Sequence, residues 1–234
     1  MKGYLPVTLA AATCLSMLTA LYMVFVYVPT EVDQGIVQRI FYFHLPCAWV
    51  TFLAFGMVAI AGGLYLWLGH KIWDDLGYAA AELGMLFCTL VLVTGSIWAK
   101  PIWGIWWTWD SRLTTTFILW LIYGGYLLLR SFADDTEEIA RFAAVLGIVG
   151  VVDVPIIIIS VRLWRTIHPA VLLTRQGEHG LEDPRMVATL LVSLGAFTIM
   201  FVWLLWVRLA TLRLRSRVAT LRRDLAVLEA GAHL

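Results

Sequence analysis

The chain has 234 residues, of which 61% are hydrophobic and only 14% are charged. A water-soluble domain of this length needs a polar surface, and so few charged residues cannot supply one. The composition therefore indicates an integral membrane protein, and the formal net charge of +1 gives no indication of nucleic-acid binding.

Six stretches are apolar over enough residues to cross a hydrocarbon core of about 30 Å, which takes roughly 20 residues of helix. They are apolar on all sides and show no period-2 alternation, which favours helices over a β-barrel. The predicted spans are 7–28, 46–68, 79–99, 114–130, 141–161 and 186–209. The prediction is an all-α polytopic membrane protein, with a transmembrane domain at 1–210 and a basic tail at 211–234. The first span is too long for a signal-peptide core and lacks a cleavage motif, so we expect it to remain in place.

The basic residues predict the orientation of the spans. An even number of spans puts both termini on one side of the membrane. The end of the sixth span and the tail after it carry Arg208, Arg213, Arg215, Arg217, Arg222 and Arg223. The positive-inside rule makes that side cytoplasmic. The loops at 29–45, 100–113 and 162–185 are then expected together on the outer side.

The second outer loop contains WGIWWTWDSRLTT, at 103–115, with four tryptophans in seven positions. Positions 103, 106, 107 and 110 follow the spacing of one helix face, so we predict a short tryptophan-rich interfacial helix. Two roles fit such a face: a tryptophan belt that anchors the helix, or a wall for a large flat apolar ligand. The candidate residues are Trp103, Trp106, Trp107, Trp109, Asp110 and Arg112.

Two histidines lie in the other outer loops. His44 stands in RIFYFHLPCAW at the mouth of the second span, and His168 stands in SVRLWRTIHPAV after the fifth, each close to a proline. Either histidine alone fits a hydrogen-bonded structural residue. Two neutral imidazoles on the same side of the membrane, however, also fit bis-histidine ligation of haem from its opposite faces.

Outer arginines extend this hypothesis, because two haem propionates need cationic partners. The candidates are Arg39, Arg112, Arg162 and Arg165. Zinc is the competing metal, but it prefers a compact tetrahedral ligand set, and no third or fourth ligand stands at suitable spacing. The sequence has no C-x-x-C-H motif, so we do not expect the covalent haem attachment of c-type cytochromes.

WGIWWTWDSRLTT resembles the signature of the WWD-domain haem-handling family, which serves cytochrome c maturation. RIFYFHLPCAW and VVDVPIIIISVRLW resemble its flanking stretches. The resemblance implies non-covalent haem b at the periplasmic face of the bacterial inner membrane, with His44 and His168 as axial ligands of the iron. It implies that the tryptophan segment holds the ring and presents it to a periplasmic haem chaperone, whose own histidine bonds to haem. It also implies an ABC-type ATPase and its permease as partners.

The resulting hypothesis is a protein that positions haem and supplies no nucleophile of its own. One alternative is a transmembrane haem channel with Asp153 on its path, although Asp153 also fits a kink residue beside Pro155. Another is a structural subunit whose tryptophans only anchor it. The tail at 212–230 has apolar residues at helical spacing between arginines, and we expect it to contact anionic membrane lipid or a cytoplasmic partner.

Overall fold

A computed structural model describes residues 4–132, 136–164, 181 and 183–232 of the chain, without the side chains of 162 and 230–232. The described residues form helices and connecting segments, with no β-strand among them. Six helical segments are long and apolar enough to span a membrane, which confirms the predicted fold class. His168 and Arg165 lie outside the described residues.

The helices follow the predicted spans but are longer. The first span is α1 (Leu5–Tyr22) with a π-helical turn, η1 (Met23–Tyr27), and the second is a 3-10 turn, η2 (Ile36–Ile40), with α2 (Phe41–Leu68). The third and fourth are α3 (Lys71–Trp103) and α4 (Ser111–Phe132). The fifth combines α5 (Glu137–Val151) with α6 (Asp153–Leu163), and the sixth is α7 (Pro184–Ala232).

Glycines and a capping threonine set several helix ends. Gly69 follows α2 with a φ of 70°, and Gly104 follows α3 with a φ of 77°. This left-handed conformation carries little cost for glycine and ends a helix without strain. At the start of α5, the Thr136 hydroxyl accepts a hydrogen bond from the backbone N–H of Ile139. Such a cap satisfies one of the N–H groups that a helix start leaves open.

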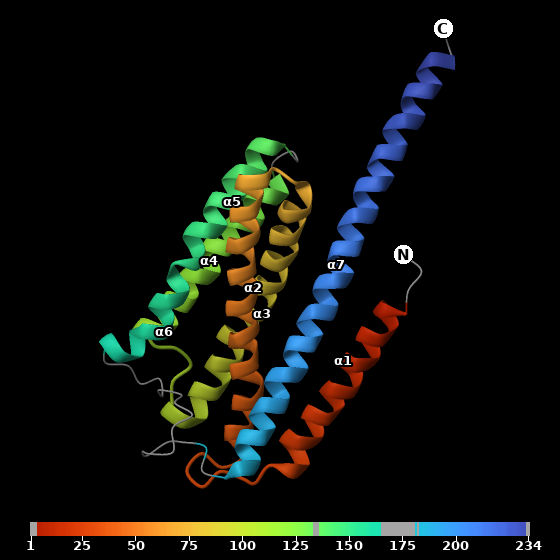
Figure 1. Ribbon diagram of the computed structural model, residues 1–234. Coiled ribbons are helices and arrows are strands. Elements are labelled where there is room, and N and C mark those ends of the chain that lie inside the picture. Colours follow the sequence, from red (N-terminus) through yellow and green to blue (C-terminus); the bar gives the residue numbers. More distant parts are fainter. Residues whose placement is uncertain (1–3, 133–135, 165–180, 182, 233–234) are drawn as a thin grey trace.

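Helix α2 is the centre of the bundle. It packs along α3 and also contacts α5 and α7, while α4 packs against α3, α5 and α6. Helix α1 packs mainly against α7. Figure 1 shows this α1–α7 pair beside the bundle, with α7 running well past the ends of the other helices. We call the end of the bundle near Trp103 and Gly104 the tryptophan end, and the end near Gly69 the opposite end.

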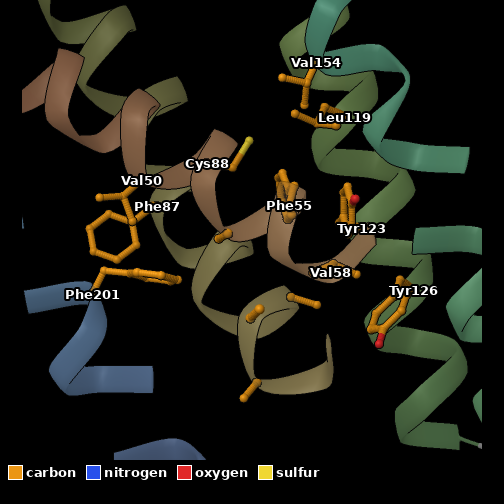
Figure 2. Close-up of a cluster of buried hydrophobic side chains, with 14 of the residues drawn as sticks. Val50, Phe55, Val58, Phe87, Cys88, Leu119, Tyr123, Tyr126, Val154 and Phe201 are labelled. Atoms are coloured by element: carbon orange, nitrogen blue, oxygen red, sulfur yellow. The ribbon is translucent and has the colours of Figure 1, made fainter. Parts of the chain in front are cut away.

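The largest buried cluster fills the middle of the bundle. A second cluster, which includes Tyr42 and Trp98, lies at the tryptophan end. The ring of Phe55 stacks on that of Tyr123, with centroids 3.6 Å apart. Figure 2 shows this pair among buried side chains of α2, α3, α4 and α7. Helices α2 and α3 approach closely because Gly84 has no side chain: a Cβ there would lie 2.5 Å from the Phe55 ring. Such close packing leaves little room for a passage.

Near the opposite end, one buried and one partly buried ion pair join three helices. The guanidinium of Arg130 in α4 donates to both carboxylate oxygens of Asp74 in α3, at 2.9 and 3.0 Å. Arg208 in α7 pairs with Glu82 in α3. The ring of Tyr78 is common to the two pairs, because the guanidinium carbons of Arg130 and Arg208 lie 5.1 and 5.7 Å from its centroid. These charges are mutually compensated, as burial requires.

Candidate functional site: a tryptophan-lined cavity with a buried histidine

A cavity of about 330 Å³ lies in the tryptophan end of the bundle, which puts it within the usual size range of ligand sites. Its walls come from the first turns of α2, α4 and α7, the last turns of α3, and α6. Most of the lining side chains are apolar. Four of the residues predicted from sequence line it: His44, Trp103, Trp107 and Arg112.

His44 is held in the wall by α2 and α3. It is only 8% exposed, and its Nδ1 lies 2.9 Å from the hydroxyl oxygen of Thr94. That hydroxyl has one proton, and its shortest contact is with the carbonyl oxygen of Leu90, at 2.6 Å. Since the Thr94 proton goes to Leu90, we assign the proton between Thr94 and His44 to Nδ1. His44 Nε2 then carries the lone pair, which is the tautomer that a metal ligand needs.

Two α3 residues near Thr94 restrict the His44 ring further. A Cβ on Gly95 would lie 3.1 Å from His44 Cε1, so glycine leaves room for the ring. Trp98 packs edge-on to it, with centroids 5.8 Å apart. The indole N–H of Trp98 donates to the side-chain oxygen of Gln34, which ties this wall to the loop before α2. These residues were not predicted from the sequence, although the polar triplet at 94–96 interrupts an apolar span.

The tryptophan segment is not a helix. Residues 104–110 adopt no regular structure, so the predicted interfacial helix was wrong. The left-handed Gly104 ends α3, and Lys100 Nζ donates to its carbonyl oxygen at 2.8 Å. In consequence the four tryptophans do not share one face, although Trp107 and Trp109 pack edge to face. Trp103 and Trp107 line the cavity, whereas Trp106 and Trp109 are 58% and 73% exposed.

Asp110 begins α4 and does not line the cavity. Its Oδ1 accepts the backbone N–H of Leu113 at 3.0 Å, and its Oδ2 accepts the hydroxyl of Thr108 at 3.2 Å. This is the arrangement of a helix N-cap. The cap fixes the start of α4, and Arg112 and Leu113 in its first turn both line the cavity.

The cavity wall contains two buried N–H donors that have no acceptor among the described residues. They are Nε of Arg112 and Nε1 of Trp107. A buried donor without an acceptor is costly, so such groups indicate a ligand or water that completes them. A carboxylate suits the guanidinium, and a large flat apolar ring suits the tryptophan walls. The described residues therefore fit a haem with its propionates.

Of the other three predicted arginines, one lies away from the cavity and the side chains of two are outside the described residues. Arg39 in η2 does not line the cavity, and its Nη1 donates to the carbonyl oxygen of Phe25 at 2.9 Å. Neither the side chain of Arg162 nor Arg165 is described. His168 is likewise outside the described residues, and α6 before it contributes Ile157 and Ile158 to the cavity wall.

Asp153 is buried at the junction of α5 and α6 and does not line the cavity. The helix breaks at Val152, one residue before it and three before Pro155, as a proline kink would produce. The Oδ2 atom of Asp153 has no hydrogen-bond partner among the described residues. Within the described part of the chain, no group of three His, Cys, Asp or Glu residues is placed to hold a metal ion.

Comparison with known proteins agrees with this geometry. A family model described as heme exporter protein C matches residues 1–224. Heme exporter protein C of Bradyrhizobium diazoefficiens is 38% identical over 218 residues, covering 92% of this chain and 81% of the relative. Heme exporter protein C of Haemophilus influenzae is 38% identical, over 78% of this chain and 74% of the relative. Heme exporter protein C of Escherichia coli strain K12 is 35% identical, over 80% of this chain and 75% of the relative. The chain is therefore a member of the haem exporter protein C family, which handles haem for cytochrome c maturation.

Proposed function

We propose that this protein binds haem b non-covalently in the cavity at the tryptophan end and presents it, at the periplasmic surface of the bacterial inner membrane, to a periplasmic haem chaperone. The observation that carries the proposal is the lining of the cavity. A histidine, two tryptophans and an arginine with an unsatisfied buried Nε–H all line one apolar cavity.

His44 acts as one axial ligand of the haem iron through Nε2, with His168 as the other. Thr94 is a positioning residue, because its hydroxyl oxygen accepts the Nδ1–H of His44 and so keeps Nε2 basic. Haem when bound supplies the iron and the vinyl edge to which the chaperone's histidine bonds. The protein supplies orientation and proximity, and no side chain of its own reacts.

The aromatic and cationic side chains set the orientation of the ring. Trp103 and Trp107 pack against its face or rim, and Arg112 holds a propionate. Trp106 and Trp109 are exposed beside the cavity and offer amphipathic surface for the docking chaperone. Arg162 and Arg165 remain candidates for the second propionate. Asp110 acts indirectly, by fixing the turn that places Arg112.

The position of the cavity favours presentation over passage through the membrane. The cavity is lined by residues at the tryptophan end, and the packed core around Phe55 and Tyr123 closes the bundle beneath it. A haem channel would need a continuous passage, with Asp153 on its wall, and Asp153 does not line the cavity. We therefore prefer presentation to the transport alternative.

The same proposal includes the setting of the protein. Both termini and the tail at 211–234 lie in the cytoplasm, while the tryptophan end faces the periplasm. An ABC-type ATPase and its permease release the loaded chaperone. The arginines of the tail support this orientation, because the positive-inside rule places such clusters on the cytoplasmic side.

Transfer in nanodiscs tests the proposal. The purified protein is loaded with haem b in nanodiscs, where both membrane faces are open, and mixed with the apo chaperone without ATPase or permease. We expect haem on the chaperone after denaturing electrophoresis, and its loss in His44→Ala. His70→Ala is the matched control, because His70 is exposed at the opposite end. If the chaperone acquires haem only from sealed vesicles with haem inside, the protein is a channel and the proposal is wrong.

A further inference from the structure

The last part of α7 carries an exposed apolar stripe that the haem site does not use. Beyond the bundle, its apolar residues alternate in steps of four and three: Leu214, Val218, Leu221, Leu225 and Leu228. Their exposed fractions run from 40% to 69%. The exposed stripe covers two heptads. Alternating steps of four and three are the spacing of a coiled-coil seam.

The stripe faces away from the core of this chain. Leu204, Leu205, Leu209 and Leu212 of α7, which all precede the stripe, pack against the core. Residues two positions apart on a helix point about 200° apart, so Leu214 points away from the side occupied by Leu212. Figure 1 shows that α7 continues past α2–α6 with no other helix alongside this last part.

The charges around the stripe disfavour an orientation flat on lipid. A helix that lies in the membrane surface has a broad apolar face, with its charges gathered on the other side. Here Arg215 and Arg222 border the stripe on one edge and Arg217 borders it on the other. The apolar face is only two heptad positions wide, which fits one partner helix. Helix α7 also continues from its span without a break.

The same charges disfavour a second copy of this chain. Two copies inserted in one orientation send α7 out of the membrane in the same direction, so their stripes would meet in parallel. In a parallel pair, Arg217 faces Arg222 of the other copy, and Asp224 faces Glu229. Both contacts join like charges, and each occurs twice in the dimer. Such an arrangement selects against self-pairing.

We propose that the stripe on α7 docks one α-helix of a different protein in a parallel coiled coil. The partner helix carries acidic residues opposite Arg217 and Arg222, and basic residues opposite Asp224 and Glu229. Its own seam is apolar at the positions that meet Leu214, Leu221 and Leu228. The proposal is independent of haem binding.

A charge-reversed copy of the chain is a suitable probe, because the membrane keeps it parallel. The variant combines Arg217→Glu, Arg222→Glu, Asp224→Lys and Glu229→Lys. Donor and acceptor fluorescent proteins are fused to the C-termini of co-expressed full-length chains, and energy transfer is measured in the isolated membranes. We expect association between unchanged and reversed chains to be roughly tenfold stronger than between unchanged chains, because four contacts change from repulsion to attraction.

Two further variants separate a coiled coil from other causes. Leu221→Glu in both chains interrupts the seam and is expected to abolish the gain in energy transfer between unchanged and reversed chains. Ser216→Glu, on the outer face of the same segment, is the matched control and is expected to keep it. Equal energy transfer for unchanged with unchanged chains and for unchanged with reversed chains would overturn the proposal. A stripe that lies on lipid would give this result. A gain that survives Leu221→Glu would overturn it as well.

Discussion

His44 Nδ1 and the Thr94 hydroxyl oxygen lie 2.9 Å apart, and the Thr94 hydroxyl is itself directed at the carbonyl oxygen of Leu90. This chain of hydrogen bonds assigns the imidazole proton to Nδ1. It runs from the backbone of α3 to a side chain of α2, so the packing of two helices decides which nitrogen of His44 is basic. A histidine with a fixed tautomer is a better ligand than one that exchanges.

Thr94→Val should therefore weaken haem binding while leaving the fold intact. Valine has nearly the shape of threonine but accepts no hydrogen bond, so His44 loses the contact that holds its proton on Nδ1. Removing such a partner typically lowers metal affinity about 10–100-fold. Thr94→Ser keeps the hydroxyl and should restore most of the affinity. Nitrogen-15 NMR of histidine-labelled apo protein checks the cause directly, because an unchanged tautomer signal in Thr94→Val would contradict it.

Gly95→Ala should disturb the same ring by crowding. The new Cβ would lie 3.1 Å from His44 Cε1, so the imidazole must shift by a few tenths of an ångström. We expect weaker haem uptake and a changed absorption spectrum. Gly63→Ala is the control, because a Cβ at Gly63 meets nothing within 4 Å and alanine in a helix is more stable than glycine by about 0.5–1 kcal/mol. The explanation fails if both variants bind haem as the parent does.

Arg112→Gln should lower the affinity for haem but not for haem dimethyl ester. The buried Arg112 Nε has no acceptor among the described residues, and a propionate would supply one. A hydrogen bond to a charged group contributes about 1.5–3 kcal/mol, which is roughly 10–150-fold in affinity. Titration of both ligands into the parent and the variant separates a propionate contact from a general loss of structure. An equal loss for both ligands would contradict the contact, and Arg141→Gln at the exposed start of α5 is the control.

Arg130→Met should strongly destabilise the bundle without touching the haem site. Arg130 and Asp74 are nearly buried, and removing Arg130 leaves the buried Asp74 carboxylate with the more exposed Lys71, 3.4 Å away. The loss of the buried partner should cost up to about 3–5 kcal/mol. The exposed pair of Arg141 and Glu137 should contribute at most about 0.5 kcal/mol. Thermal unfolding in detergent compares Arg130→Met with Arg141→Met. Similar midpoints for the two variants would show that the buried pair is not structural.

Much of the fold could be predicted from the sequence, because a hydrocarbon core of about 30 Å imposes the length and apolar composition of each span. The turns by which the helices extend beyond the predicted spans could not be predicted. Helix α3 continues to Trp103 through Lys100 and Pro101, where the apolar pattern had already stopped. The break at Val152 was suggested only by Asp153 and Pro155. The pairing of Arg130 with Asp74 was missed, since 56 residues separate them.

The site was predicted in part, for reasons that particular residues show. His44, Trp103, Trp107 and Arg112, which were candidates from the sequence, line one cavity. The helical spacing of the tryptophans was misleading, because one residue, Gly104, ends α3 within the motif. Asp110 was a candidate ligand contact because of its place in the motif, but its carboxylate caps the start of α4. The polar triplet at 94–96 marked Thr94 as unusual in an apolar span, but only the packing of α2 on α3 brings it to His44.

The absorption spectrum of the haem-loaded protein, oxidised and dithionite-reduced, tests the central claim most directly. It is recorded for the purified parent beside His44→Ala, His168→Ala and the control His70→Ala. The account predicts a bis-histidine haem spectrum in the parent and in His70→Ala, and a shifted or lost spectrum in each of the other two variants. A parent that takes up haem and gives the same spectrum in all three variants would place the ligands elsewhere. A parent that takes up no haem would contradict the proposed function itself.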